Sequence, residues 1–263
     1  MKTITKFLIN LISVGSIVLI ATLNISQFAV VGQPKINTPD RPPNPIPGGP
    51  RFIPPTEGIV EDGGPPTQPG RPVRGGCASI SQLGLTALVP TNKIGRTVFD
   101  YPTFFFYLPP TEAESAEFIL KDQSGKQIYK QDLTISNLSG VIGVSIPPNK
   151  NVPPLEVGKN YTWNFTMICD SLDRSADQSE SGTVRRVELS ADIRSQLDQA
   201  DPRQKTVIYA ENGIWQDALS TLAAARRDQP NDTTFKADWE SLLDSVKLGE
   251  ISQEPIVQIE AQP

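Results

Sequence analysis

The sequence predicts a mixed fold in which β-structure precedes α-structure: an antiparallel, immunoglobulin-like β-sandwich followed by a helical hairpin tail. Short segments rich in β-branched and aromatic residues recur between residues 83 and 189, separated by turn residues. After residue 189 the apolar residues recur at helical spacing instead. A chain of 263 residues is long enough for one or two such domains.

Changes in composition divide the chain into five expected regions. They are a signal peptide or membrane anchor (1–32), a disordered Pro/Gly-rich linker (33–76), the β-sandwich (77–189), the helical tail (190–250) and a disordered tail (251–263).

The amino-terminal region has the pattern of an export signal. Lys2 and Lys6 precede an uncharged apolar run over residues 7–23, which is typical of secretory signals. The run is also nearly long enough to remain as a membrane anchor. The sequence leaves open whether cleavage would occur after Ala29 or after Gly32. We therefore expect an exported protein of the periplasm or cell envelope, with membrane contact only through this region if it is not cleaved.

The linker is dominated by residues that oppose regular structure. Between Pro34 and Pro72 there are 13 prolines and 6 glycines. Both residue types disfavour helices and central strands, so an extended tether is expected. A ligand for a proline-recognition domain is the alternative.

Several segments beyond the linker have strand character. The sharp alternation of apolar and polar residues over 161–169 predicts a half-buried strand, and the polar turn at 122–125 predicts a hairpin. The remaining expected strands cover residues 83–89, 97–108, 141–146 and 183–189. The aromatic run at 104–107 places side chains on both faces of its strand, and we expect the helical tail to cover the second face.

Cys77 and Cys169 are the only two cysteines. Export to an oxidising compartment favours a disulfide between them, which would close a loop of roughly ninety residues. Two buried free thiols are the alternative.

The helical tail contains a specific spacing of small and aromatic residues. Ser190 and Asp201 are expected to cap its first helices, and a further amphipathic helix contains Trp239. The spaced residues are Tyr209, Gly213, Trp215, Ala218, Leu222, Ala225 and Pro230. This spacing resembles the second part of a tetratricopeptide repeat, which implies a tight turn at Gly213 and close helix packing at the alanines. The alternative is an ordinary helical hairpin packed on the sandwich, which the same residues would also form.

Five blocks of the body carry a second resemblance. They are Gly75–Cys77, Leu85–Pro90, Pro102–Pro109, Pro154–Phe165 and Tyr209–Leu219. Together they resemble a cyanobacterial family catalogued as domain of unknown function 928, over roughly Gly75 to Ile251. The resemblance implies one continuous unit in a bacterial envelope and brings no activity, substrate or catalytic residue.

The composition excludes several kinds of chemistry. The chain has no histidine, so Ser-His-Asp and Cys-His nucleophiles cannot be built. The phosphate-binding glycine motifs are absent from the sequence, and a net charge of −5 argues against nucleic acid as a partner. We expect no cofactor and no catalytic residue. The weak metal candidate is the acidic group Asp170, Asp173, Asp177 and Glu180, for which a solvated polar loop is the default interpretation.

The sequence thus favours an exported envelope protein that acts as a non-catalytic protein-interaction or scaffold module, with an unidentified protein partner. The alternative is a carboxylate-based enzyme or sensor that acts on cell-wall glycan or a small ligand, because paired carboxylates need no histidine.

Overall fold

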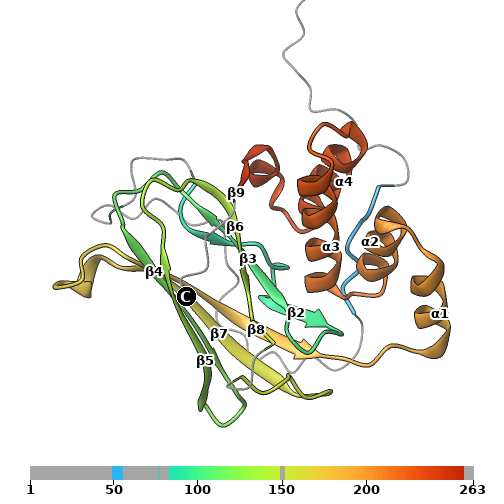
Figure 1. Ribbon diagram of the computed structural model, residues 1–263, viewed down its shortest axis with the longest axis horizontal. Coiled ribbons are helices and arrows are strands. Elements are labelled where there is room, and N and C mark those ends of the chain that lie inside the picture. Colours follow the sequence, from blue (N-terminus) through green and yellow to red (C-terminus); the bar gives the residue numbers. More distant parts are fainter. Residues whose placement is uncertain (1–48, 56–76, 78–82, 149–151, 258–263) are drawn as a thin grey trace, which may run out of the picture. The chain divides into compact units, whose positions relative to one another are not determined.

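The computed structural model describes residues 49–55, 77, 83–148 and 152–257. The expected signal or anchor over residues 1–32 lies outside the described residues. In the described part, strands precede helices along the chain, as the sequence predicts, and the helices gather beside the sheets (Figure 1). None of the helices described there is long and apolar enough to span a membrane.

The first sheet has four strands in the order β1-β3-β6-β9. These strands are β1 (Thr86–Ala87), β3 (Thr103–Leu108), β6 (Gly140–Ser145) and β9 (Ile256–Val257). The centre of the sheet is the antiparallel pair β3–β6, in which Phe105 lies opposite Gly143. The expected strand over 83–89 is therefore reduced to the two residues of β1.

The second sheet has five strands in the order β2-β8-β7-β4-β5. These strands are β2 (Ile94–Thr97), β8 (Gln178–Arg186), β7 (Asn160–Ile168), β4 (Ser115–Lys121) and β5 (Gln127–Thr134). The predicted hairpin is formed by β4 and β5, and its turn is closed by a hydrogen bond from the Gly125 amide to the Asp122 carbonyl. The alternation predicted over 161–169 is that of β7, whose Tyr161, Trp163 and Phe165 are buried.

Two strand pairs correct the prediction of a wholly antiparallel fold. β2 runs parallel to β8, and β9 runs parallel to β6, so both sheets are mixed. Alternation along a strand records which face is buried and is the same for either chain direction, so it does not report orientation. The expected disordered tail from residue 251 also differs from the structure, because residues 251–257 complete a short helix and form β9.

Four α-helices follow the sheets in the described chain. They are α1 (Ala191–Gln199), α2 (Pro202–Glu211), α3 (Trp215–Asp228) and α4 (Thr233–Asp244). The predicted caps are confirmed: Ser190 Oγ accepts from the Ile193 amide, and Asp201 and Gln204 form a reciprocal capping box. Two 3₁₀-helices, η1 (Arg174–Ala176) and η2 (Gly249–Gln253), lie in the β7–β8 connection and after α4.

Strand β3 joins two hydrophobic cores. Phe104 and Phe106 point into the core shared by the two sheets, where Phe106 stacks on Phe165 with ring centroids 4.2 Å apart. Phe105 and Tyr107 point the opposite way, into the core formed with the helices. The expectation that the helical tail covers the second face of this aromatic strand is confirmed.

The predicted disulfide between Cys77 and Cys169 is present, with 92 residues of sequence separation. It attaches the end of the linker to the end of β7. A cross-link over this length removes much of the conformational freedom of the unfolded chain, which the chain-entropy model values at about 4–5 kcal/mol.

Replacing both Cys77 and Cys169 by alanine should lower the free energy of unfolding by about 4–5 kcal/mol, measured by urea denaturation under non-reducing conditions. Protein from the native source, denatured without reductant, should contain no titratable thiol. Two titratable thiols in that sample would contradict a native disulfide.

Candidate functional site

The start of α3 fixes the helices to the sheets. The Trp215 indole Nε1 donates to the Leu88 carbonyl oxygen at 2.8 Å. Two residues later, the Asp217 carboxylate accepts from Thr97 Oγ1 at 2.7 Å and from the Val98 amide at 2.8 Å. All three bonds join α3 to the strand β2 or to the connections that flank β1 and β2.

Asp217 is an unusual group for such an attachment, because its side chain is almost completely buried. Burial raises the pKa of the Asp217 carboxyl to about 7, although the hydrogen bonds from Val98 and Thr97 oppose the shift. Its place in the first turn of α3 also favours the ionised form, since the helix amino terminus carries partial positive charge. The attachment is therefore sensitive to protonation near neutral pH.

Five residues of the repeat-like spacing gather in one core together with Trp239 of α4, whereas Pro230 is exposed. Tyr209, Trp215, Ala218, Leu222, Ala225 and Trp239 are all at most 7% exposed and belong to the cluster that contains Phe105 and Tyr107 of β3. Gly213 occupies the turn between α2 and α3 with φ 70°, a backbone conformation that favours glycine. The spacing thus locates a real helical hairpin, and one face of that hairpin packs on the four-stranded sheet.

A segment from the middle of the expected linker lies on the other side of these helices. Residues 49–55 run beside α2, α3 and α4 (Figure 1, blue). Pro50 and Phe52 are buried, whereas Arg51 and Ile53 are exposed, so alternate residues of the segment face the helices. The sequence does not predict this contact, because its only sign there is one proline and one phenylalanine within a proline-rich stretch.

Three hydrogen bonds hold the backbone of this segment. The Phe52 amide donates to Ser245 Oγ at 3.0 Å, and Ser241 Oγ donates to the Pro50 carbonyl oxygen at 3.1 Å. The Ile53 amide donates to the Ala210 carbonyl oxygen, at the end of α2, at 3.0 Å. Each bond uses a backbone group of the segment, so none of them depends on its side chains.

One side chain anchors the segment. The Phe52 ring meets the Trp215 indole edge to face, with centroids 5.2 Å apart, and Phe52 is 8% exposed. Gly213 lets the chain approach closely, since a Cβ placed there would lie 2.9 Å from Pro55 Cδ and 3.1 Å from the Ile53 carbonyl oxygen. We call the residues that contact the segment, namely Ala210, Gly213, Trp215, Ser241 and Ser245, the docking surface.

Ionic contacts tie α4 to its neighbours. The buried Asp238 carboxylate accepts from Arg203 of α2 through both oxygens, at 2.6 and 3.0 Å, and this pairing raises the pKa of Arg203. Arg226 of α3 lies over the Trp239 ring, 5.1 Å from its centroid, and burial lowers the pKa of Arg226. These contacts fix the relative positions of the helices that carry the docking surface.

An open pocket of about 630 Å³ lies between α1 and α2. Its lining includes three glutamines, the charged residues Asp201 and Arg203, and the apolar residues Val207 and Ile208. Its charged groups already have partners, since Asp201 caps α2 and Arg203 binds Asp238. Neither Asp201 nor Arg203 is therefore a free charged group in this pocket.

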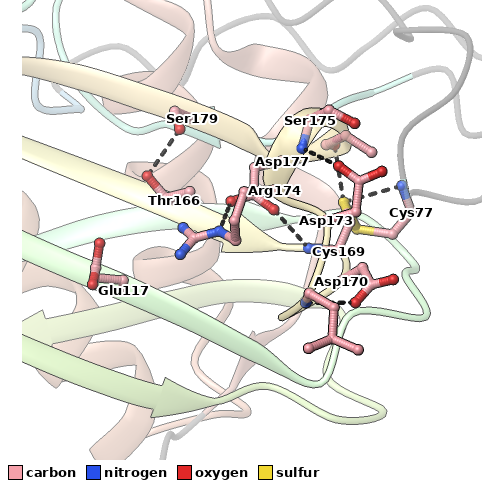
Figure 2. A network of polar contacts seen from close by, with 12 residues as sticks. Cys77, Glu117, Thr166, Cys169, Asp170, Asp173, Arg174, Ser175, Asp177 and Ser179 are labelled. Carbon is pink, nitrogen blue, oxygen red and sulfur yellow. Dashed lines mark hydrogen bonds and ion pairs between the residues drawn. A yellow bond between two sulfur atoms is a disulfide. The ribbon is translucent and has the colours of Figure 1, made fainter.

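Three of the four weak metal candidate residues are engaged within the loop that follows β7 (Figure 2). Asp170 accepts from the Leu172 amide, Asp173 from the Ser175 amide, and Asp177 from the Cys169 amide while it pairs with Arg174. Glu180 lies apart from them on β8, with Lys93 3.5 Å away. Within the described residues, no group of three or more Cys, Asp or Glu side chains is arranged to hold a metal ion.

The pKa of the partly buried Glu180 carboxyl is also shifted. Burial raises the pKa of Glu180, and the nearby Lys93 ammonium acts in the opposite direction. Asp217 and Asp238, whose carboxylates are more deeply buried, lie on α3 and α4 and bind Thr97 and Arg203. Each of these three groups has its own partner on a different element.

The chain was also compared with known families and proteins. Residues 69–256 match the model of the family described as Domain of Unknown Function (DUF928). The chain belongs to this family. The DUF928 region begins near the end of the linker and extends to β9, so it contains both sheets and every helix described, and it excludes residues 49–55. No curated protein matches the chain.

The raised pKa of Asp217 predicts a pH-dependent stability. Between about pH 4 and pH 7 the folded protein holds a proton that the unfolded chain releases, so the free energy of unfolding should fall as the pH rises. Asp217→Asn should remove this component, whose slope approaches about 1.4 kcal/mol per pH unit. Urea denaturation at several pH values measures it.

Asp192→Asn is the matched control, because Asp192 also lies in the first turn of a helix but is exposed. It should keep the slope of the parent. If Asp217→Asn keeps that slope too, the carboxyl titrates at its ordinary pKa.

The contact between Gly213 and Pro55 predicts unequal effects at two glycines. Gly213 and Gly125 both have positive φ, at 70° and 80°, but a Cβ on Gly125 would have no atom within 4 Å. Gly125→Ala should lower the free energy of unfolding by about 1 kcal/mol through backbone strain alone. Gly213→Ala should cost more, because the methyl group collides with Pro55. Equal losses in urea denaturation would show that the segment does not lie against Gly213.

Proposed function

We propose that this protein is an exported component of a bacterial cell envelope that acts as a non-catalytic protein-interaction module. Its binding site in this proposal is the docking surface on α2, α3 and α4. The β-sheets serve as the rigid base that holds these helices, through Trp215 and Asp217.

The observation that carries the proposal is the extended segment 49–55 on the helices. Backbone hydrogen bonds to Ser241, Ser245 and Ala210, together with one aromatic anchor, are the means by which domains recognise extended peptides. Aromatic anchors in buried pockets dominate the affinity of such contacts. A surface that holds a peptide of its own chain in this way is suited to hold a peptide of another protein.

The proposed location is supported by the sequence of residues 1–32, where two lysines precede an apolar run. The disulfide Cys77–Cys169 agrees with it, because such bonds persist in oxidising compartments. The part of the Pro/Gly-rich stretch that precedes the docked segment, residues 33–48, would hold the folded body away from the membrane or extend through the wall layer.

We further propose that the two sheets are a β-sandwich of immunoglobulin-like type. Support comes from their shared core, in which Phe106 of one sheet contacts Phe165 and Trp163 of the other. The parallel pairs β2–β8 and β6–β9 would be departures from the usual antiparallel pattern.

The alternative function, a carboxylate-based enzyme or sensor for glycan, requires two carboxyl groups that face one substrate. The candidate acid with a raised pKa is Glu180, which is paired with Lys93. Since Asp217 and Asp238 are bound to other elements, no observation favours this alternative over the interaction module.

The interaction module can be tested by photo-cross-linking in the native envelope. A photoreactive amino acid replaces Lys247, an exposed residue that follows Ser245 of the docking surface by two positions and lies outside the segment 49–55. The full chain should then form a discrete adduct with another envelope protein, identified by mass spectrometry.

Lys126 is the matched control position, because it is also an exposed basic residue but lies at the β4–β5 turn. No adduct with the same protein is expected from that position. Identical adducts from both positions, or none from Lys247, would contradict a partner site on the helices.

A further inference from the structure

We propose that the docking surface is a binding site for an extended peptide segment of another protein that carries a proline followed two residues later by an aromatic side chain. Residues 49–55 occupy this surface as an internal competitor. This inference rests on the proposed function and adds the chemistry of the ligand and the means by which binding is controlled.

The ligand chemistry follows from the two side chains that the surface buries. Pro50 and Phe52 face the helices, and the side chains between and after them, Arg51 and Ile53, are exposed. The three hydrogen bonds go to backbone groups and accept any sequence in extended conformation. Recognition therefore depends on a proline and an aromatic residue spaced two positions apart, and not on charge.

Two of the three groups of the docking surface that bind the segment also have partners of their own. Ser245 Oγ also donates to the Leu242 carbonyl oxygen at 2.6 Å, and the Ala210 carbonyl oxygen also accepts from the Gly213 amide at 3.1 Å. Trp215 is held by Leu88 from the opposite side. Departure of residues 49–55 would expose Trp215 and Ser241 Oγ to solvent, where water can replace the Pro50 carbonyl oxygen, while Ser245 and Ala210 would keep their partners.

The position of the segment in the chain makes exchange possible. Residues 49–55 lie outside the part of the chain that matches the family, which begins at residue 69. Residues 56–76 connect the segment to Cys77 with a sequence rich in proline and glycine. A segment tethered in this way competes at an effective concentration on the order of millimolar, so that a free ligand must bind more tightly or through several contacts to displace it.

The test uses the full chain with Phe52→Ala, which removes the anchor of the internal competitor. The probe is a fluorescein-labelled peptide with the sequence of residues 48–55, GGPRFIPP, and binding is followed by fluorescence anisotropy. The Phe52→Ala protein should bind this peptide at least about tenfold more tightly than the parent protein, whose surface is occupied.

Two control peptides define the specificity. A peptide with the Phe52→Ala change should lose binding, and one with Ile53→Ala should bind like the parent peptide, because Ile53 is 53% exposed. Equal binding to parent and Phe52→Ala proteins, or binding of the Phe52→Ala peptide, would overturn the proposal. Exchange of the segment between copies would give a stable dimer of the parent chain in sedimentation, and it would overturn the assignment to a separate partner.

A second measurement covers the case in which Phe52→Ala prevents folding. In the parent protein, the Phe52 and Ile53 amides should exchange with deuterium at least about a hundredfold faster than the amides in the middle of α3, because the segment detaches by local opening. Protection equal to that of α3 would make the segment part of the permanent core and would overturn the proposal.

The two proposals can fail separately. An adduct from the Lys247 position without peptide binding would support the interaction module and contradict the proposed ligand chemistry. Peptide binding without any envelope adduct would support the proposed ligand chemistry and contradict the proposal of an envelope partner.

Discussion

The burial of strand β3 on both faces is the constraint on which the other parts of this fold depend. Phe104 and Phe106 require the second sheet as a cover, and Phe105 and Tyr107 require the helices. A strand with four consecutive aromatic residues would otherwise present a large apolar surface to water. The helices are therefore a structural part of the β body, and the attachment through Trp215 and Asp217 places them at a defined register on it.

This dependence explains why the repeat-like spacing has a double role. Trp215 donates from its indole nitrogen to Leu88, contacts the sheet side of the helical core and offers its edge to Phe52. The helical hairpin is thus packed on the sheet, as the more ordinary interpretation of the spacing requires, and still presents a second face that holds an extended peptide. The two interpretations describe opposite sides of the same helices.

Local patterns in the sequence predict the parts of the fold whose cause is local. The alternation along β7, the β4–β5 turn and the caps Ser190 and Asp201 each depend on residues within a few positions of one another. The sequence does not predict β2 and β9, because strands of two to four residues have too little periodicity to recognise. The candidate site was predicted only in part: Gly213 and Trp215 follow from their spacing, but Ser241 and Ser245 act through single hydroxyl groups that leave no pattern.

The parallel pairing of β9 with β6 has a consequence for the order in which the chain folds. Val141 of β6 lies opposite Ile256, so an edge of the first sheet is completed by residues that are made more than a hundred positions later. Pairing over such a distance requires a large loss of chain entropy before any contact is gained, and proteins dominated by such contacts fold slowly. We therefore expect that the four-stranded sheet is not complete while the chain is still emerging from the ribosome, because β9 is among the last described residues to be made.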